Sequence, residues 1–179
     1  MKDFEENLRN LVLAPYISRA TALIGIQRDI GGNAFRHQMA CLAILIDYKY
    51  SDSILLKASV IHDLLEDIQS TDISEIRSID PEANQVVNLV EEVTKKQDEL
   101  KNDYLQRILE TGSTKAKILK VADRIANLIE ITSDLYSKEK IDSYLEQTKK
   151  YIIPIARQVN QNMFIELNDL VKKRKSLCR

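Results

Sequence analysis

The stretch HDLLED, at residues 62–67, ends a segment with apolar residues at helical spacing and places four ionisable side chains within six positions. On a helix, side chains four residues apart lie on one face, so His62 would pair with Glu66 and Asp63 with Asp67. Neighbouring carboxylates repel one another, and a divalent cation would relieve that repulsion. We therefore expect a metal site at this segment.

The chain contains only two histidines, and both fit such a site. His37 lies one predicted helix before His62, and Asp123 lies downstream in the string KVADRIAN, at residues 120–127. Each residue taken alone is more often structural, and it is the joint pattern that indicates chemistry. Two imidazoles and two carboxylates form a mixed nitrogen and oxygen site, which suits Mn, Fe, Zn or Co better than Ca.

Two carboxylates of the same segment are not needed as ligands. Water on a divalent ion becomes acidic enough to attack a phosphoester near neutral pH. Glu66 and Asp67 could take the proton from that water. The segment therefore predicts a hydrolytic centre as well as a metal site.

Helical spacing of apolar residues covers almost the whole chain, while glycine and proline are scarce, with 4 and 3 copies. Strands need frequent turns, which use these residues. We predict an all-α fold, a single domain over residues 1–179 with about eight to ten helices and no significant β-sheet. The last helical pattern covers 138–175, and Pro154 predicts a kink or break within it.

The composition argues against several classes of protein. A net charge of −1 gives no reason to expect nucleic acid or an anionic membrane as a partner. No apolar run approaches the roughly 20 residues that span a membrane, and the acidic start MKDFEENLRN is wrong for a secretory signal. Cys41 and Cys178 form no disulfide framework, so we expect a cytoplasmic protein. The basic end KKRKSLCR reads as a solvated helix end.

The strings HDLLED and ADRIAN (122–127) resemble the HD superfamily of metal-dependent phosphohydrolases. The similarity is greatest to the hydrolase domain of RelA/SpoT homologues, particularly the single-domain small alarmone hydrolases. It covers about residues 22–156, and NLVEEVTK (88–95) also resembles the segment between the two motifs. The resemblance implies a helical HD domain that holds one manganese ion through four side chains: His37, His62, Asp63 and Asp123.

The resemblance also implies an activity. It is the hydrolysis of the 3′-pyrophosphate of guanosine tetra- or pentaphosphate to GDP or GTP and pyrophosphate, with Glu66 and Asp67 activating the water. The candidate substrate contacts are Arg28, Asn127, Lys140 and Tyr144. Arg28 has a solvated loop charge as its alternative, and Tyr144 a place in the core or at its rim.

Two departures from the family pattern keep other functions open. Asp29 stands where a second basic residue is usual, and Ile129 where arginine is frequent, so both remove positive charge near the presumed substrate. The alternatives are an HD phosphohydrolase acting on another nucleotide phosphoester, and a non-catalytic, antitoxin-like module that binds a partner. We expect the helix over 138–175 to pack on the rest of the domain; packing on a second copy, in a homo-oligomer, is the alternative.

Overall fold

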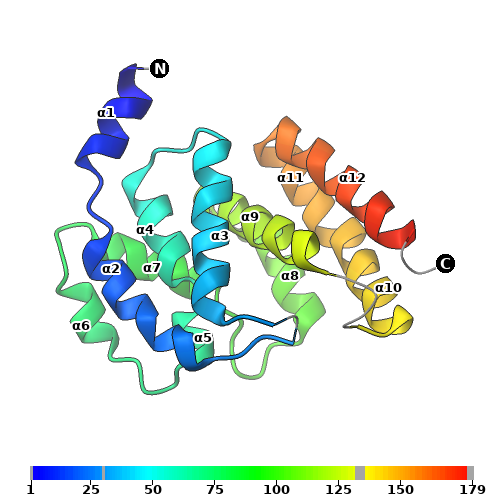
Figure 1. Ribbon diagram of the computed structural model, residues 1–179, viewed down its shortest axis with the longest axis horizontal. Coiled ribbons are helices and arrows are strands. Elements are labelled where there is room, and N and C mark those ends of the chain that lie inside the picture. Colours follow the sequence, from blue (N-terminus) through cyan, green and yellow to red (C-terminus); the bar gives the residue numbers. More distant parts are fainter. Residues whose placement is uncertain (1, 30, 132–135, 177–179) are drawn as a thin grey trace. The chain divides into compact units, whose positions relative to one another are not determined.

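The protein is all-α in the computed structural model, which describes residues 2–29, 31–131 and 136–176 (Figure 1). Within these ranges the one bridge between extended residues joins Gln27 and Asn33. The prediction of an all-α fold without a significant sheet is therefore confirmed. No helix in the described ranges is long and apolar enough to cross a membrane. Cys178 and the end of the basic tail lie outside the described residues.

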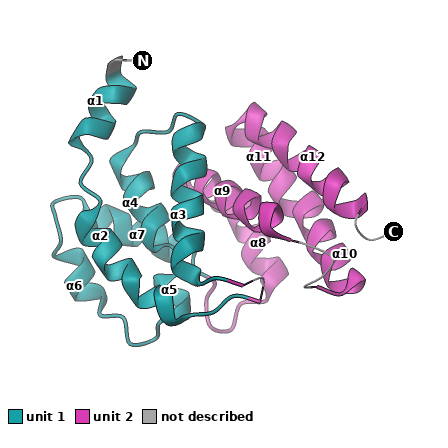
Figure 2. Ribbon diagram, viewed as in Figure 1, with its two compact units in different colours: residues 1–28, 32–94 teal, residues 29–31, 95–179 magenta. Residues whose placement is uncertain are grey.

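The chain divides into two compact units (Figure 2). Unit 1 comprises residues 1–28 and 32–94, and unit 2 comprises residues 29–31 and 95–179. The predicted single domain over the whole chain stays a prediction. The two units are described separately below.

Unit 1 consists of short helices around one central helix. Its elements are α1 (Lys2–Asn10), α2 (Ala14–Ala20), the 3₁₀ helix η1 (Thr21–Gly25), α3 (Ala34–Asp47), α4 (Ser53–Ile61), α5 (Leu64–Asp67), α6 (Ile73–Arg77) and α7 (Ala83–Val93). The central helix is α4, which packs against α2, α3 and α7. Every residue from Leu55 to Ile61 is buried, as is typical of a helix covered on all sides.

Buried charge in unit 1 is neutralised locally. Lys57, on the central helix α4, is buried, and its ammonium lies 2.8 Å from Asp80 and 2.7 Å from Glu82. Burial alone would lower the pKa of Lys57, but hydrogen bonds to the two carboxylates outweigh it and raise that pKa. The ion-paired lysine therefore ties α4 to the turn that precedes α7.

The structure corrects one expectation about HDLLED. We expected all six residues on one helix, but α4 ends at Ile61, and α5 begins at Leu64. His62 and Asp63 form the turn between them, with backbone angles still near the helical region. The amide of Asp67 donates to the carbonyl of Asp63 at 2.9 Å, so the backbone over these two positions keeps the four-residue spacing of a helical turn.

Unit 2 is built on one long helix. Its elements are α8 (Lys101–Thr111), α9 (Thr114–Glu130), α10 (Lys138–Gln147), the π-helical turn η2 (Thr148–Ile152), α11 (Ile153–Val159) and α12 (Gln161–Ser176). The α9 helix packs against α8, α11 and α12. The pattern over 138–175 is interrupted near Pro154, as predicted, and again at Asn160, where α11 ends.

Candidate metal centre and its surroundings

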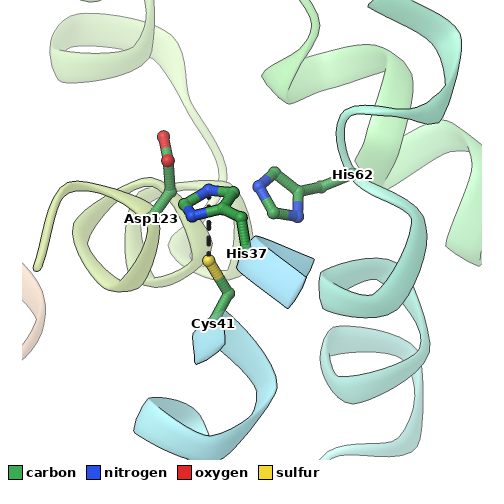
Figure 3. Close-up of side chains that lie close together, drawn as sticks. All are labelled: His37, Cys41, His62 and Asp123. Carbon is green, nitrogen blue, oxygen red and sulfur yellow. Dashed lines mark hydrogen bonds between the residues drawn. The ribbon is translucent and has the colours of Figure 1, made fainter. Parts of the chain in front are cut away.

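Two helical segments of unit 1 bring imidazole, thiol and carboxylate groups together. His37 and Cys41 lie one turn apart on α3, while His62 and Asp63 form the turn after α4. Figure 3 shows the ring of His62 beside that of His37, and their centroids are 5.5 Å apart. Both histidines are buried, with 3% and 5% of their surfaces exposed. Buried imidazoles need partners, so their hydrogen bonds decide what the site can hold.

The hydrogen bonds of His62 leave one nitrogen available to a cation. Its Nδ1 lies 2.9 Å from the backbone carbonyl of Ser59. A carbonyl only accepts, so Nδ1 carries the proton in the neutral ring, and Nε2 carries a lone pair. That Nε2 is buried and makes no hydrogen bond to any residue in the described ranges. A second nitrogen fixed by a backbone carbonyl is the usual arrangement of a metal-binding histidine.

Asp63 lies against both imidazoles. Its Oδ1 is 3.4 Å from His62 Nε2, and its Oδ2 is 3.8 Å from His37 Nε2. Gln38, which is fully buried, donates from Nε2 to Oδ2 of Asp63 at 2.9 Å. The Nε2 of His62, the imidazole of His37 and the carboxylate of Asp63 together form a nitrogen and oxygen donor set that fits a divalent transition-metal ion.

Cys41 is a residue of this cluster that the sequence analysis did not assign to the site. Its Sγ lies 3.6 Å from His37 Nε2, as the dashed line in Figure 3 marks, and its surface is completely buried. His37, Cys41 and His62 each offer one ligand atom, and these atoms lie within 4.8 Å of one another. The four-residue spacing from His37 was the available signal, because it places both side chains on one face of a helix.

The predicted proton-transfer pair lies on α5. Both Glu66 and Asp67 are exposed. Partial loss of solvent raises the pKa of Asp67, the carboxylates of Asp63 and Glu66 raise it further, and the two histidines lower it. A carboxylate with a raised pKa is a stronger base, as proton abstraction from water requires.

Asp123 lies in unit 2, where its carboxylate is held by two donors of its own helix. Lys120 forms an ion pair with Oδ2, and Asn127 donates to Oδ1. Burial alone would lower the pKa of Lys120, but the charge of Asp123 outweighs it and raises that pKa well above its usual value. Asp123 is itself buried. Because Asp123 belongs to the other unit, its place beside the histidines stays a prediction.

The remaining candidate contacts of unit 2 are engaged with their neighbours. The guanidinium of Arg124 lies 3.9 Å from the centre of the Tyr144 ring and donates to Thr148. Lys140 donates to Asp29 at 2.9 Å, and both side chains are exposed. Asp29 therefore neutralises the charge of Lys140, which we predicted to contact a phosphate; both residues belong to unit 2.

The loop RDIGGN contains the predicted turn. Gly31 and Gly32 have φ of 84° and 73°, values that favour glycine. The amide of Arg28 donates to the carbonyl of Gly32, and Asn33 caps α3 by accepting from the amide of Arg36. The role of Arg28 as a substrate contact stays a prediction.

Comparisons with known proteins define the fold class first. No family model and no curated protein matches the sequence. Solved structures do match, and the fold is that of a protein described as a metazoan ortholog of SpoT that hydrolyzes ppGpp. That likeness has a TM-score of 0.76 at 22% identity and covers 90% of this chain and 94% of the other.

A second solved structure shares the fold over a smaller part of this chain. It is the protein lmo0812 from Listeria monocytogenes, with a TM-score of 0.60 at 22% identity. The match covers 78% of this chain and 99% of that one. The helical fold implied by the sequence resemblance is thus found in solved structures.

Proposed function

We propose that this chain is a metal-dependent phosphohydrolase that removes the 3′-pyrophosphate of guanosine tetra- or pentaphosphate. The observation that carries the proposal is the buried lone pair on His62 Nε2, beside His37 and Asp63. A buried acceptor without a donor is costly unless a ligand satisfies it. The fold shared with a ppGpp hydrolase supports the choice of substrate.

Four side chains would hold the cation: His37, His62 and Asp63 of unit 1, and Asp123 of unit 2. When bound, a divalent ion such as Mn²⁺ supplies Lewis-acid activation of water near neutral pH. Gln38 holds the carboxylate of Asp63 by its 2.9 Å hydrogen bond. In unit 2, Asn127 holds the carboxylate of Asp123 in the same way. These amides reduce the freedom that two carboxylates would lose on binding a cation.

Proton transfer falls to the exposed carboxylates of α5. Asp67, with its raised pKa, accepts a proton from the attacking water, and Glu66 keeps the negative field that raises this pKa. The water oxygen bonds to the phosphorus that carries the ribose O3′. The bond between that phosphorus and O3′ then breaks, and the proton held by Asp67 passes to O3′. The products are GDP or GTP and pyrophosphate.

Substrate binding requires exchange of partners within unit 2. Lys140 must leave Asp29 to reach a phosphate, because one ammonium cannot fully neutralise both. Tyr144 already has the Arg124 guanidinium over its ring, so a base would stack on the other face. Arg28 and Asn127 complete the proposed contacts. The proposed partner is a small nucleotide, and the proposed location is the cytoplasm.

The metal site is tested by calorimetric titration of chelator-treated protein with Mn²⁺. We expect one ion per chain in the wild type and no measurable binding in His62→Ala or Asp63→Ala. Glu66→Gln is the matched control, since it should bind the ion as the wild type does. Normal Mn²⁺ binding by Asp63→Ala would contradict the assignment.

The activity is tested by pyrophosphate release from ppGpp with Mn²⁺ present. Glu66→Gln and Asp67→Asn should lose rate by roughly 10²–10⁴-fold, the usual contribution of a positioned acid or base. A panel of nucleoside triphosphates, cyclic nucleotides and 3′-phosphates, read by phosphate and pyrophosphate release, checks the substrate. If the protein binds metal but hydrolyses another member of the panel, the chain is still a phosphohydrolase, and the proposed substrate is wrong.

A further inference from the structure

The thiol of Cys41 lies where a shared cation would place it. Donors at the usual Zn–N and Zn–S lengths of about 2.0 and 2.3 Å, at a tetrahedral angle, are roughly 3.5 Å apart. The distance from His37 Nε2 to Cys41 Sγ is 3.6 Å. A plain sulfur–imidazole hydrogen bond also has this length, so the distance needs a second observation beside it.

That second observation is the buried nitrogen of His62. The Nε2 of His62 has no hydrogen bond from the described residues. A ring nitrogen of His62 also lies within 4.8 Å of both Cys41 Sγ and a ring nitrogen of His37. Two ring nitrogens and one sulfur thus lie close enough together inside unit 1 to bind one ion. A buried cysteine that only packs in a core behaves as a small apolar residue and does not require imidazole nitrogens beside its sulfur.

We propose that Cys41 is a ligand for soft divalent cations, and that it joins His37 and His62 when Zn²⁺ or Co²⁺ enters the site. Thiolate sulfur favours Zn²⁺ and Co²⁺, whereas Mn²⁺ prefers oxygen and nitrogen. Mn²⁺ therefore leaves the sulfur unbound. The inference rests on the proposed metal site but not on the proposed substrate.

The extra ligand has a consequence for the choice of ion. Zinc is almost always four-coordinate, and a fourth donor such as Asp63, 3.4 Å from His62 Nε2, would close the site to water. A larger coordination number around Mn²⁺ leaves positions open. Cys41 would therefore make Zn²⁺ a tightly bound inhibitor of the proposed Mn²⁺ enzyme.

Cobalt spectroscopy on the full chain tests the inference without any activity assay. Chelator-treated protein is titrated with Co²⁺ in the absence of oxygen. A near-ultraviolet sulfur-to-cobalt charge-transfer band should appear in the wild type and saturate with the visible d–d bands. The band should persist in Cys178→Ser, which removes the other cysteine, and disappear in Cys41→Val.

Competition between Zn²⁺ and Mn²⁺ for the wild type and for Cys41→Val measures how much the sulfur contributes to the affinity for each ion. Loss of the sulfur should weaken Zn²⁺ binding by at least the roughly 10–100-fold typical of losing a contact around a metal. Mn²⁺ affinity should change by less than threefold, about 0.7 kcal/mol or less. The circular dichroism of Cys41→Val shows whether the variant is folded.

The possible failures are distinct. If wild-type protein binds Co²⁺ with d–d bands but without the charge-transfer band, Cys41 is not a ligand, and the nitrogen and oxygen site stands. If Co²⁺ does not bind at all, both this inference and the proposed metal site are wrong. The wild-type spectrum decides the question even if Cys41→Val does not fold.

Discussion

In unit 1, the Nε2 lone pair of His62 is buried without a hydrogen bond from any described residue, whereas in unit 2 the carboxylate of Asp123 accepts from Lys120 and Asn127. The first group needs a cation to be satisfied. The second is already neutralised and must exchange Lys120 for anything that binds. The comparison teaches that two buried polar groups of one chain can differ in what they need: His62 Nε2 has no donor among the described residues, whereas the carboxylate of Asp123 has two.

The largest effect on Mn²⁺ binding and hydrolysis should come from changing His62 in unit 1. His62→Ala removes the Nε2 lone pair, so we expect loss of Mn²⁺ binding. Hydrolysis of ppGpp should then fall roughly 10⁴-fold or more, as when one member of an interdependent catalytic group is removed. The metal-free variant should also be less stable, because His62→Ala removes a buried side chain and its Nδ1 hydrogen bond to Ser59. Thermal unfolding with and without Mn²⁺ separates the two effects: Mn²⁺ should raise the melting temperature of the wild type and leave that of the variant unchanged. A variant that Mn²⁺ still stabilises would break the comparison.

In unit 2, a change to the ion pair of Lys120 and Asp123 should act on the stability of the metal-free protein. Lys120→Met leaves the buried carboxylate of Asp123 without its ion pair, which should destabilise the metal-free protein by about 3 kcal/mol. Mn²⁺ should restore much of that loss if Asp123 is a ligand. Urea unfolding at two Mn²⁺ concentrations measures both the loss of stability and its recovery. Lys117→Met, on the same helix, removes a hydrogen bond to the neutral side chain of Gln158; it is the control and should show neither effect.

The amide of Gln38 gives a smaller effect in unit 1. Gln38→Met keeps the buried volume but removes the hydrogen bond to Asp63. We expect Mn²⁺ affinity to fall roughly 10–100-fold, as for other residues that orient ligands. The maximal rate at saturating Mn²⁺ should stay within a few-fold of the wild type. Unchanged affinity in calorimetric titration would show that Asp63 needs no such support.

Substrate affinity should reveal whether Asp29 competes for Lys140. Asp29→Ala removes the partner of an exposed ion pair, so KM for ppGpp should fall roughly two- to fivefold, in line with the modest strength of such pairs. Lys140→Ala should raise KM. Asp142→Ala, which removes a different ion pair of α10, with Lys175, is the control. A rise in KM for Asp29→Ala would contradict the exchange of partners.

The smallest effect concerns acid stability. Arg107 donates to both carboxylate oxygens of Glu99, at 2.7 and 3.0 Å, and lowers the pKa of Glu99 from 4.5 to about 2. A folded pKa below the unfolded one contributes stability that is present above pH 4.5 and lost as pH falls toward 2. Glu99→Gln should therefore be less stable at pH 7 and lose less between pH 5 and 2. Glu110→Gln, exposed on α8, should follow the wild-type profile in denaturant titrations.

Local spacing predicted the parts of the fold and the site that depend on one helix. Scarce glycine and proline, with apolar residues at helical spacing, predicted the all-α fold. The four-residue spacing in ADRIAN placed Asn127 one turn after Asp123, and the two do contact each other. The same spacing joins His37 to Cys41, but the apolar surroundings of Cys41 favoured a core position over a ligand.

Contacts between distant segments could not be predicted. Lys140 and Asp29 are 111 positions apart, and no local pattern shows that one neutralises the other. The end of α4 at Ile61 was also missed, because HDLLED contains neither glycine nor proline to stop a helix. Tertiary packing, which a single sequence does not display, decides both features.

The stop of α4 at Ile61 determines the chemistry of His62. A helix that ends leaves its last carbonyls without intrahelical donors, and the carbonyl of Ser59 is one of these. The imidazole immediately after the helix fills that vacancy with its Nδ1 proton. The backbone thereby selects the tautomer before any ion arrives, and a cation approaching Nε2 of the neutral ring finds no proton to displace.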